Sequence, residues 1–236
     1  MKNIILSIAI FILFIGCTMS TQYKEQMNTI EEAEILFDDD IGEASLTKNF
    51  YFAIDVSGSM DGGCSGKRKM DGAKNAILKF LDVVPNDVNL GLLLFGTDTE
   101  ITEVVSLGPN NREEFKSEIN KLNPNGSTPL GMATRTGTSK LVEQYKKQLG
   151  YGEYRLIIVT DGNADSSSNF RRALENCYKY PFIAIYGIGL CMDSGNVLRT
   201  YALSYIDAKD YKQLEKALTS TIAELPVFDP TDFTEE

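Results

Sequence analysis

Apolar residues along the chain follow two different spacings. Short aliphatic and aromatic runs end in glycine or in oxygen-bearing residues, which is typical of strands buried on both faces of a sheet. Between these runs, apolar residues recur every three or four positions, which predicts helices with one buried face. The predicted strands cover residues 50–54, 90–95, 101–107, 154–160, 182–189 and 205–208, and the predicted helices cover residues 70–84, 111–122, a long segment that begins at Pro129, 170–180, 196–203 and a last segment that carries Leu214, Ala217, Leu218 and Ile222.

The order of these elements predicts the fold class. Strands that alternate with helices imply right-handed crossovers, and therefore a doubly wound α/β domain whose mostly parallel central sheet has helices on both faces. The weaker alternation of residues 101–107 favours an edge strand, which we expect to run antiparallel to its neighbour. Ligands of such sheets bind beyond the carboxyl ends of the strands, where the topology switches.

The end of the first predicted strand is the principal candidate site. The run Phe50-Tyr51-Phe52-Ala53-Ile54 stops at Asp55, which is followed by Ser57, Gly58 and Ser59. The glycine allows the backbone to turn tightly enough to bring one carboxylate and two hydroxyls to one point. Oxygen atoms of these kinds are ligands for hard divalent cations.

Two later loops carry matching chemistry at the same predicted edge of the sheet. The turn-rich residues 123–130 contain Thr128, and the aliphatic run 154–160 stops at Asp161. Two alternatives stay open at this point. Ser57, Gly58 and Ser59 could form a helix-entry turn without an ion, and Thr128 could serve only as the N-cap of the helix that follows.

These motifs together resemble the von Willebrand factor A (vWA) family, whose metal-ion-dependent adhesion site begins with DxSGSM. The resemblance covers roughly residues 48–225 and implies a Rossmann-like fold. It implies that Ser57, Ser59 and Thr128 coordinate Mg²⁺ or Mn²⁺, with Ca²⁺ less suitable, and that Asp55 and Asp161 act directly or through water. It also implies a protein partner whose Asp or Glu carboxylate completes the shell of the ion. Asp165 and Asp193 are expected to be loop carboxylates rather than ligands.

Composition excludes several classes of function. The formal net charge of −10 and the pI near 4.7 disfavour nucleic-acid binding, which needs clustered Lys and Arg. The chain has no histidine, which removes Ser-His-Asp catalysis and the usual zinc sites. Side chains with oxygen atoms therefore remain as the candidate ligands for a metal ion.

Two other classes of function are alternatives to a metal-dependent adhesion module, namely an enzyme and a structural component. Asp55 after a strand could be the nucleophile of a Mg²⁺-dependent phosphatase of the haloacid-dehalogenase type, but that chemistry needs an Asp two positions later, where the chain has Ser57. The other rival is a metal-independent structural component of a cell-envelope assembly. We therefore expect a protein that is not an enzyme.

The N-terminal residues indicate export and lipid anchoring. Residues 1–16 contain an apolar block too short to span a membrane, and Ile15-Gly16-Cys17 looks like a bacterial lipobox, with Phe14 where Leu is usual. We expect residues 1–16 to be a signal peptide, Cys17 to carry the lipid, and residues 17–47 and 226–236 to be an acidic tether and an acidic tail. An uncleaved anchor or plain cleavage are the alternatives to this bacterial cell-envelope lipoprotein.

Export would allow the three remaining cysteines to pair. Cys64 and Cys191 both follow predicted strands and should lie at the carboxyl edge of the sheet, whereas Cys177 should lie at the far edge. We therefore expect a Cys64–Cys191 disulfide and a buried Cys177 thiol. Three reduced, unrelated cysteines are the alternative.

Overall fold

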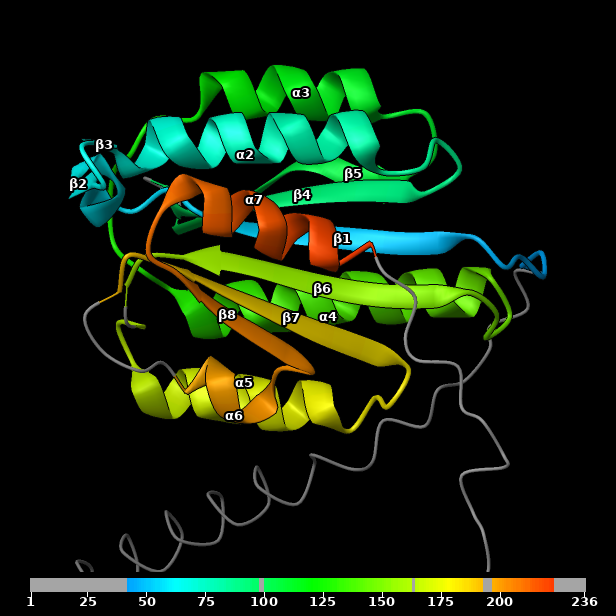
Figure 1. Cartoon of the computed structure of the whole chain (residues 1–236). Coiled ribbons are helices and arrows are strands. Elements are labelled where there is room, and N and C mark those ends of the chain that lie inside the picture. Colours follow the sequence, from blue (N-terminus) through cyan, green and yellow to red (C-terminus); the bar gives the residue numbers. More distant parts are fainter. Residues whose placement is uncertain (1–41, 98–99, 163, 193–196, 223–236) are drawn as a thin grey trace, which may run out of the picture. The chain divides into compact units, whose positions relative to one another are not determined.

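A six-stranded sheet lies at the centre of the computed structural model, which describes residues 42–97, 100–162, 164–192 and 197–222 (Figure 1). The strands lie in the order β5-β4-β1-β6-β7-β8. All neighbours are parallel except β4 and β5, which pair antiparallel at one edge. Both the sheet class and the antiparallel edge strand predicted from the sequence are confirmed. The strands are β1 (Lys48–Asp55), β4 (Asn89–Thr97), β5 (Glu100–Gly108), β6 (Glu153–Thr160), β7 (Ile183–Leu190) and β8 (Ser204–Ala208).

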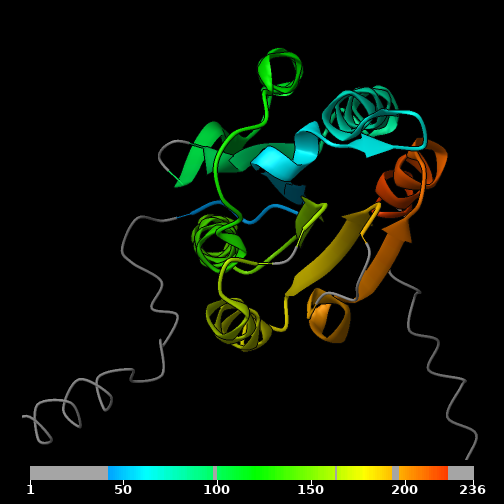
Figure 2. The ribbon, with the colours of Figure 1, turned by 90° about the vertical axis from the view of Figure 1, so that its left-hand side faces the viewer.

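Helices cover both faces of the sheet, as Figure 2 shows from the side of the strands' carboxyl ends. Side chains of β1 alternate between the two cores: Phe50, Phe52 and Ile54 lie in one, and Tyr51 and Ala53 lie in the other. This alternation explains why a fully apolar run forms the central strand. One face carries α2 (Lys69–Val83), α3 (Arg112–Lys121) and α7 (Tyr211–Ser220), and the opposite face carries α4 (Leu130–Lys147), α5 (Ser167–Tyr178) and α6 (Leu198–Tyr201).

A small substructure between β1 and α2 was not foreseen from the sequence, which suggested only a glycine-rich loop. The 3-10 helix η1 (Gly58–Asp61) leads into a hairpin of β2 (Gly63–Cys64) and β3 (Lys67–Arg68). Its turn uses Ser65 and Gly66, both with positive φ. Strands of two residues have no periodicity to detect, which is why the pattern missed them.

The strand order places the topological switch between β1 and β6. The chain leaves β1 for β4 on one side, whereas β6, β7 and β8 follow one another on the other side. The carboxyl ends of β1 and β6 are therefore adjacent at the position where open α/β sheets bind ligands.

Part of the expected domain organisation falls outside the described residues. This applies to the signal peptide 1–16, to Cys17, to the tether up to residue 41 and to the tail 226–236. Contacts of the domain begin before β1, because the Glu43 N–H donates to the Lys147 carbonyl and the Gln148 side chain donates to the Ser45 and Thr47 carbonyls. No helix in the described part of the chain is long and apolar enough to cross a membrane.

A disulfide joins the β2–β3 hairpin to the end of β7. Cys64 and Cys191 form this bond with their Cα atoms 6.1 Å apart, and Cys177 is a buried free thiol. The Tyr211 hydroxyl reinforces the same junction, because it lies 2.8 Å from the Cys64 carbonyl oxygen. A Cβ on Gly72 would overlap the Tyr211 ring, so only glycine lets α7 pack this closely on α2.

Removal of the disulfide is expected to lower the stability of the protein. The bond closes a loop with a sequence separation of 127, for which chain entropy alone gives up to about 5 kcal/mol. For Cys64→Ala/Cys191→Ala we expect a loss of about 2–4 kcal/mol in urea unfolding. Cys177→Ala is the control, since it removes a thiol but keeps the cross-link. An unfolding midpoint that is the same with and without reductant in the wild type would contradict the expectation.

Candidate functional site

Asp55, the last residue of β1, is the buried centre of the site. Its side chain is fully enclosed, with 0% of the residue exposed. Its Oδ1 accepts a hydrogen bond from the Ser57 N–H at 2.8 Å, and its Oδ2 accepts one from the Thr160 hydroxyl at 2.6 Å. Burial raises the pKa of Asp55 to about 6; the hydrogen bonds from Ser57 and Thr160 oppose this shift, and the neighbouring Asp161 adds to it.

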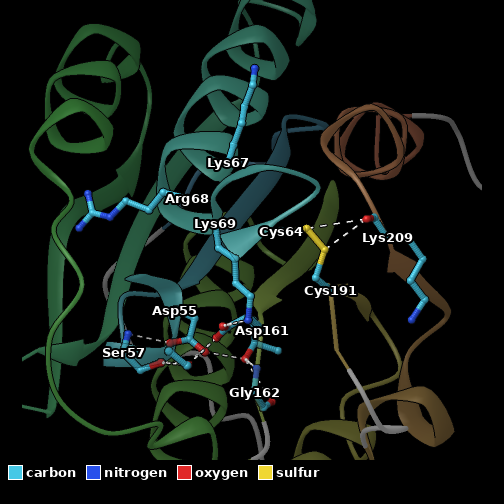
Figure 3. A network of polar contacts seen from close by, with 12 residues as sticks. Asp55, Ser57, Cys64, Lys67, Arg68, Lys69, Asp161, Gly162, Cys191 and Lys209 are labelled. Atoms are coloured by element: carbon cyan, nitrogen blue, oxygen red, sulfur yellow. Dashed lines mark hydrogen bonds and ion pairs between the residues drawn. A yellow bond between two sulfur atoms is a disulfide. The ribbon is translucent and has the colours of Figure 1, made fainter. Parts of the chain in front are cut away.

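The two serines and Asp161 form a continuous row of oxygen atoms next to Asp55 (Figure 3). The hydroxyl oxygens of Ser57 and Ser59 are 3.0 Å apart, and the Ser59 hydroxyl donates to Asp161 Oδ1 at 2.7 Å. The tight turn of η1 brings the serines together, because the Met60 N–H donates to the Ser57 carbonyl. The buried Met60 side chain fixes this turn in the core.

Thr128 reaches the same place from a separate loop. Backbone hydrogen bonds join this loop to the serine loop, from the Asn125 N–H to the Val56 carbonyl and from the Gly58 N–H to the Gly126 carbonyl. The hydroxyl oxygens of Ser59 and Thr128 lie 3.8 and 3.9 Å from the position that a Cβ would take on Gly162. The structure thus brings Asp55, Ser57, Ser59, Thr128 and Asp161 to one corner of the sheet.

The Thr128 side chain does not cap the following helix. The helix α4 begins at Leu130 with Pro129 in the N-cap position and without a side-chain capping bond. The Asp165 carboxylate instead holds the Thr128 backbone, accepting from its N–H at 2.8 Å. The alternative that Thr128 serves only as an N-cap is therefore wrong. Asp165, which was expected to be a loop carboxylate, positions Thr128. Asp193 lies outside the described residues.

Gly96, at the end of β4, allows the two loops to approach each other. Its φ is +88°, and a Cβ there would lie 2.6 Å from both the Ser57 nitrogen and the Ser127 carbonyl oxygen. A side chain would force the serine loop and the threonine loop apart. This contact could not be predicted from the sequence pattern, because it arises from the pairing of β4 with β1.

Lys69 and Thr160 complete the site and were also missed by sequence reasoning. The Lys69 ammonium lies 2.7 Å from Asp161 Oδ2. Lys69 is the first residue of α2, and its position after a basic pair in Lys67-Arg68-Lys69 did not distinguish it from a surface lysine. Thr160 follows Val159, which lies in register with Ile54, so its side chain is on the same face of the sheet as Asp55 and beside it. This register depends on the pairing of β1 with β6.

The donor set fits a hard divalent cation. Distances of 2.7 and 3.0 Å between consecutive oxygens are close to the separation of about 2.9 Å between neighbouring ligands of an octahedral ion with bonds of 2.0–2.1 Å. The Lys69 ammonium shows that a cation is accommodated beside Asp161. Within the described ranges no three carboxylate or thiolate groups converge, so an ion bound here would depend on the hydroxyls.

The enclosure of Asp55 disfavours phosphatase chemistry. Both carboxylate oxygens already accept hydrogen bonds, and no surface of the residue is exposed to a substrate. The residue two positions later is Ser57, whose hydroxyl contacts Ser59. The acid that this chemistry needs two positions after the nucleophile is therefore not present at residue 57.

Comparisons with known proteins identify the family of the domain. Residues 49–235 match the model of the von Willebrand factor type A domain. Inter-alpha-trypsin inhibitor heavy chain H3 of Mesocricetus auratus is 30% identical over 171 residues, which are 67% of this chain but only 18% of that protein. The uncharacterized protein YwmC of Bacillus subtilis is 24% identical over 195 residues, covering 75% of this chain and 84% of that protein.

A solved structure shows the same fold at low sequence identity. Manganese-loaded TRAP protein of Plasmodium vivax aligns with a TM-score of 0.56 and 19% identity, over 76% of this chain and 75% of that one. With the domain model matched over most of the sequence, and with the sheet and the oxygen-rich corner described above, the chain belongs to the von Willebrand factor type A domain family.

Proposed function

We propose that the chain is a non-enzymatic protein-interaction module that takes up Mg²⁺ or Mn²⁺ at the carboxyl edge of its sheet and binds a partner's carboxylate there. The observation that carries the proposal is the convergence of three hydroxyls and two carboxylates from three loops at the topological switch. When bound, the ion would supply a coordination position that an Asp or Glu of a protein partner can complete. The manganese-loaded state of the TRAP protein supports this class of ion.

In the proposed site, some residues would bind the ion and the exposed position of one of them would leave the ion accessible to a partner. Ser57, Ser59 and Thr128 would hold the ion through neutral hydroxyls, with Asp55 and Asp161 acting directly or through water. Neutral ligands leave most of the positive charge of an ion available to a partner, and Mg²⁺ keeps some of its water readily. Ser59 is exposed, so the row of oxygens opens to solvent where a partner can approach.

We also propose where the module works. Cleavage after residue 16 and a lipid on Cys17 would place residues 48–225 at a bacterial membrane as part of the cell envelope. The acidic residues between Cys17 and the domain, and those of residues 226–236, would act as solvated segments. The net charge of −10 supports a partner other than nucleic acid.

One observation favours a second candidate, a metal-independent structural component of an envelope assembly. The Lys69 ammonium already neutralises part of the charge at Asp161, so the corner has a counterion without any metal. The two candidates differ in whether chelation abolishes binding to the partner.

Titration of metal into the full-length protein, purified in detergent, tests the ion site. We expect saturable heat with Mg²⁺ and Mn²⁺ by isothermal titration calorimetry. Thr128→Ala and Asp55→Asn should lower the affinity at least tenfold, as loss of a ligand or of its support commonly does. Thr219→Ala, which removes an exposed hydroxyl on α7, is the matched control and should bind as the wild type does. Wild-type protein that gives no heat with either ion would contradict the proposal.

A carboxylate probe tests whether a bound ion keeps an open position. With Mn²⁺ bound to the protein, we expect paramagnetic broadening of the acetate methyl resonance beyond that caused by the same Mn²⁺ held by EDTA. The broadening should disappear in Thr128→Ala at the same Mn²⁺ concentration. Metal binding without acetate broadening would make the ion structural and would reject the partner-binding role.

The contact at Gly96 gives a third test. Gly96→Ala places a side chain at φ +88° against both loops, so we expect a loss of about 1–3 kcal/mol in stability together with weaker Mg²⁺ binding. Gly108→Ala is the control, because a Cβ there meets no atom within 4 Å. Chemical denaturation and calorimetry of both variants provide the comparison. Unchanged Mg²⁺ affinity in a folded Gly96→Ala would show that the spacing of the two loops does not matter for the ion.

A further inference from the structure

Lys69 lies in the site but is not among the residues that would hold the ion in the proposed function. Of the three consecutive basic residues Lys67, Arg68 and Lys69, only Lys69 points into the site, as Figure 3 shows. Arg68 turns away and pairs with Asp61 at 2.6 Å, and Lys67 is exposed. The Lys69 side chain is only 14% exposed, and the Asp161 side chain that it contacts is 0% exposed. The ion pair is therefore part of the site and not a surface pair.

The backbone fixes Lys69 in this position. Its N–H donates to the Gly62 carbonyl at 2.9 Å, and the Gly62 N–H donates to the Ser59 carbonyl at 3.0 Å. Two backbone hydrogen bonds through Gly62 thus connect Lys69 to Ser59, which is a candidate ligand of the ion. The aliphatic part of its side chain crosses Gly62, where a Cβ would lie 4.0 Å from the Lys69 Cε.

The β2–β3 hairpin holds the same segment from the other side. The Cys64–Cys191 disulfide joins it to the end of β7, and the Tyr211 hydroxyl lies 3.1 Å from the Arg68 carbonyl oxygen. The start of α2 is therefore tied to α7 and to the end of β7, which pairs with β6. The ammonium is held beside Asp161 by a rigid junction, and it can leave only by rotation of its own side chain.

Both oxygens of Asp161 are occupied in this arrangement. The Ser59 hydroxyl donates to Oδ1, and Lys69 donates to Oδ2. A divalent ion seated on Ser59 and near Asp161 would lie close to the ammonium, and two cations at such a distance repel each other strongly in a poorly solvated corner. The ammonium and the ion would therefore compete for the negative charge of the Asp161 carboxylate.

We propose that Lys69 is an internal counterion that competes with the divalent cation for Asp161 and so sets the metal affinity of the site. This inference rests on the proposed function, because it assumes that the five oxygen-bearing residues take up Mg²⁺ or Mn²⁺. Without metal, the ammonium neutralises Asp161 and keeps the corner folded. With metal, the Lys69 side chain leaves Asp161, and the energy of the lost ion pair lowers the apparent affinity.

Calorimetric titration of Mg²⁺ into three full-length proteins tests the competition. Lys69→Met keeps an unbranched side chain up to the ε position and removes the charged ammonium. It should bind Mg²⁺ roughly tenfold more tightly than the wild type, as coupling between competing sites predicts. Lys67→Met is the matched control, because it removes the same charge from an exposed residue two positions away. It should bind as the wild type does. Lys69→Gln is a second variant if Lys69→Met does not fold.

Thermal unfolding gives an independent readout. In EDTA, Lys69→Met should unfold at a lower temperature than Lys67→Met, because Asp161 then lacks its counterion. Saturating Mg²⁺ should raise the unfolding temperature of Lys69→Met by more than it raises that of the wild type.

The outcomes separate this inference from the proposed function. Tighter binding by Lys69→Met and not by Lys67→Met supports the competition. Wild-type binding with equal or weaker binding by Lys69→Met overturns the competition and leaves the proposed function standing, with Lys69 then orienting Asp161 for the ion. Binding by Lys69→Met alone supports the competition and counts against metal use by the wild type. Absence of binding in every variant rejects both.

Discussion

The hydrogen bonds of Asp55 join the two strands on either side of the topological switch. One oxygen of this carboxylate fixes the loop that leaves β1, and the other accepts from Thr160 at the end of β6. An unpartnered carboxylate would be very unfavourable at such depth, so the two donors are a condition for placing it there. The serine turn and Asp161 take their positions from these two strand ends. The oxygen-rich corner therefore depends on one buried charge whose partners come from residues far apart in the sequence.

Much of the fold could be predicted from the sequence, because the apolar pattern within each short segment determines whether it forms a strand or a helix. The buried core contains the side chains of the continuous apolar runs in β1, β4 and β6. It also contains the apolar side chains that recur at helical spacing in α2 and α7. The five oxygen-bearing residues were found for a similar reason, since each follows or opens a segment with a clear period. The convergence of the serine loop with Asp161 also followed from the rule that parallel strands present their carboxyl ends at one edge.

The remaining features could not be predicted because they depend on pairing between distant segments. Lys69 is one of three consecutive basic residues, and only the short hairpin before it decides which of them points to Asp161. Gly96 matters because β4 lies beside β1, and Asp165 matters because its loop lies beside Thr128. Thr128 has the residue type of an N-cap, but the tertiary contacts of its loop determine its role. Side-chain chemistry was visible in the sequence, whereas the supporting contacts were not.

The position of β1 has a mechanical consequence. The chain enters the domain near Glu43 at the amino end of β1, and the oxygen-rich corner lies at the opposite end of the same strand. A pull between the chain before Glu43 and a partner held at that corner would act along β1. β1 is paired along its length with β4 on one side and β6 on the other. The load would shear many hydrogen bonds at once instead of opening them one after another, because these bonds run across the strands. The arrangement is suited to resisting tension.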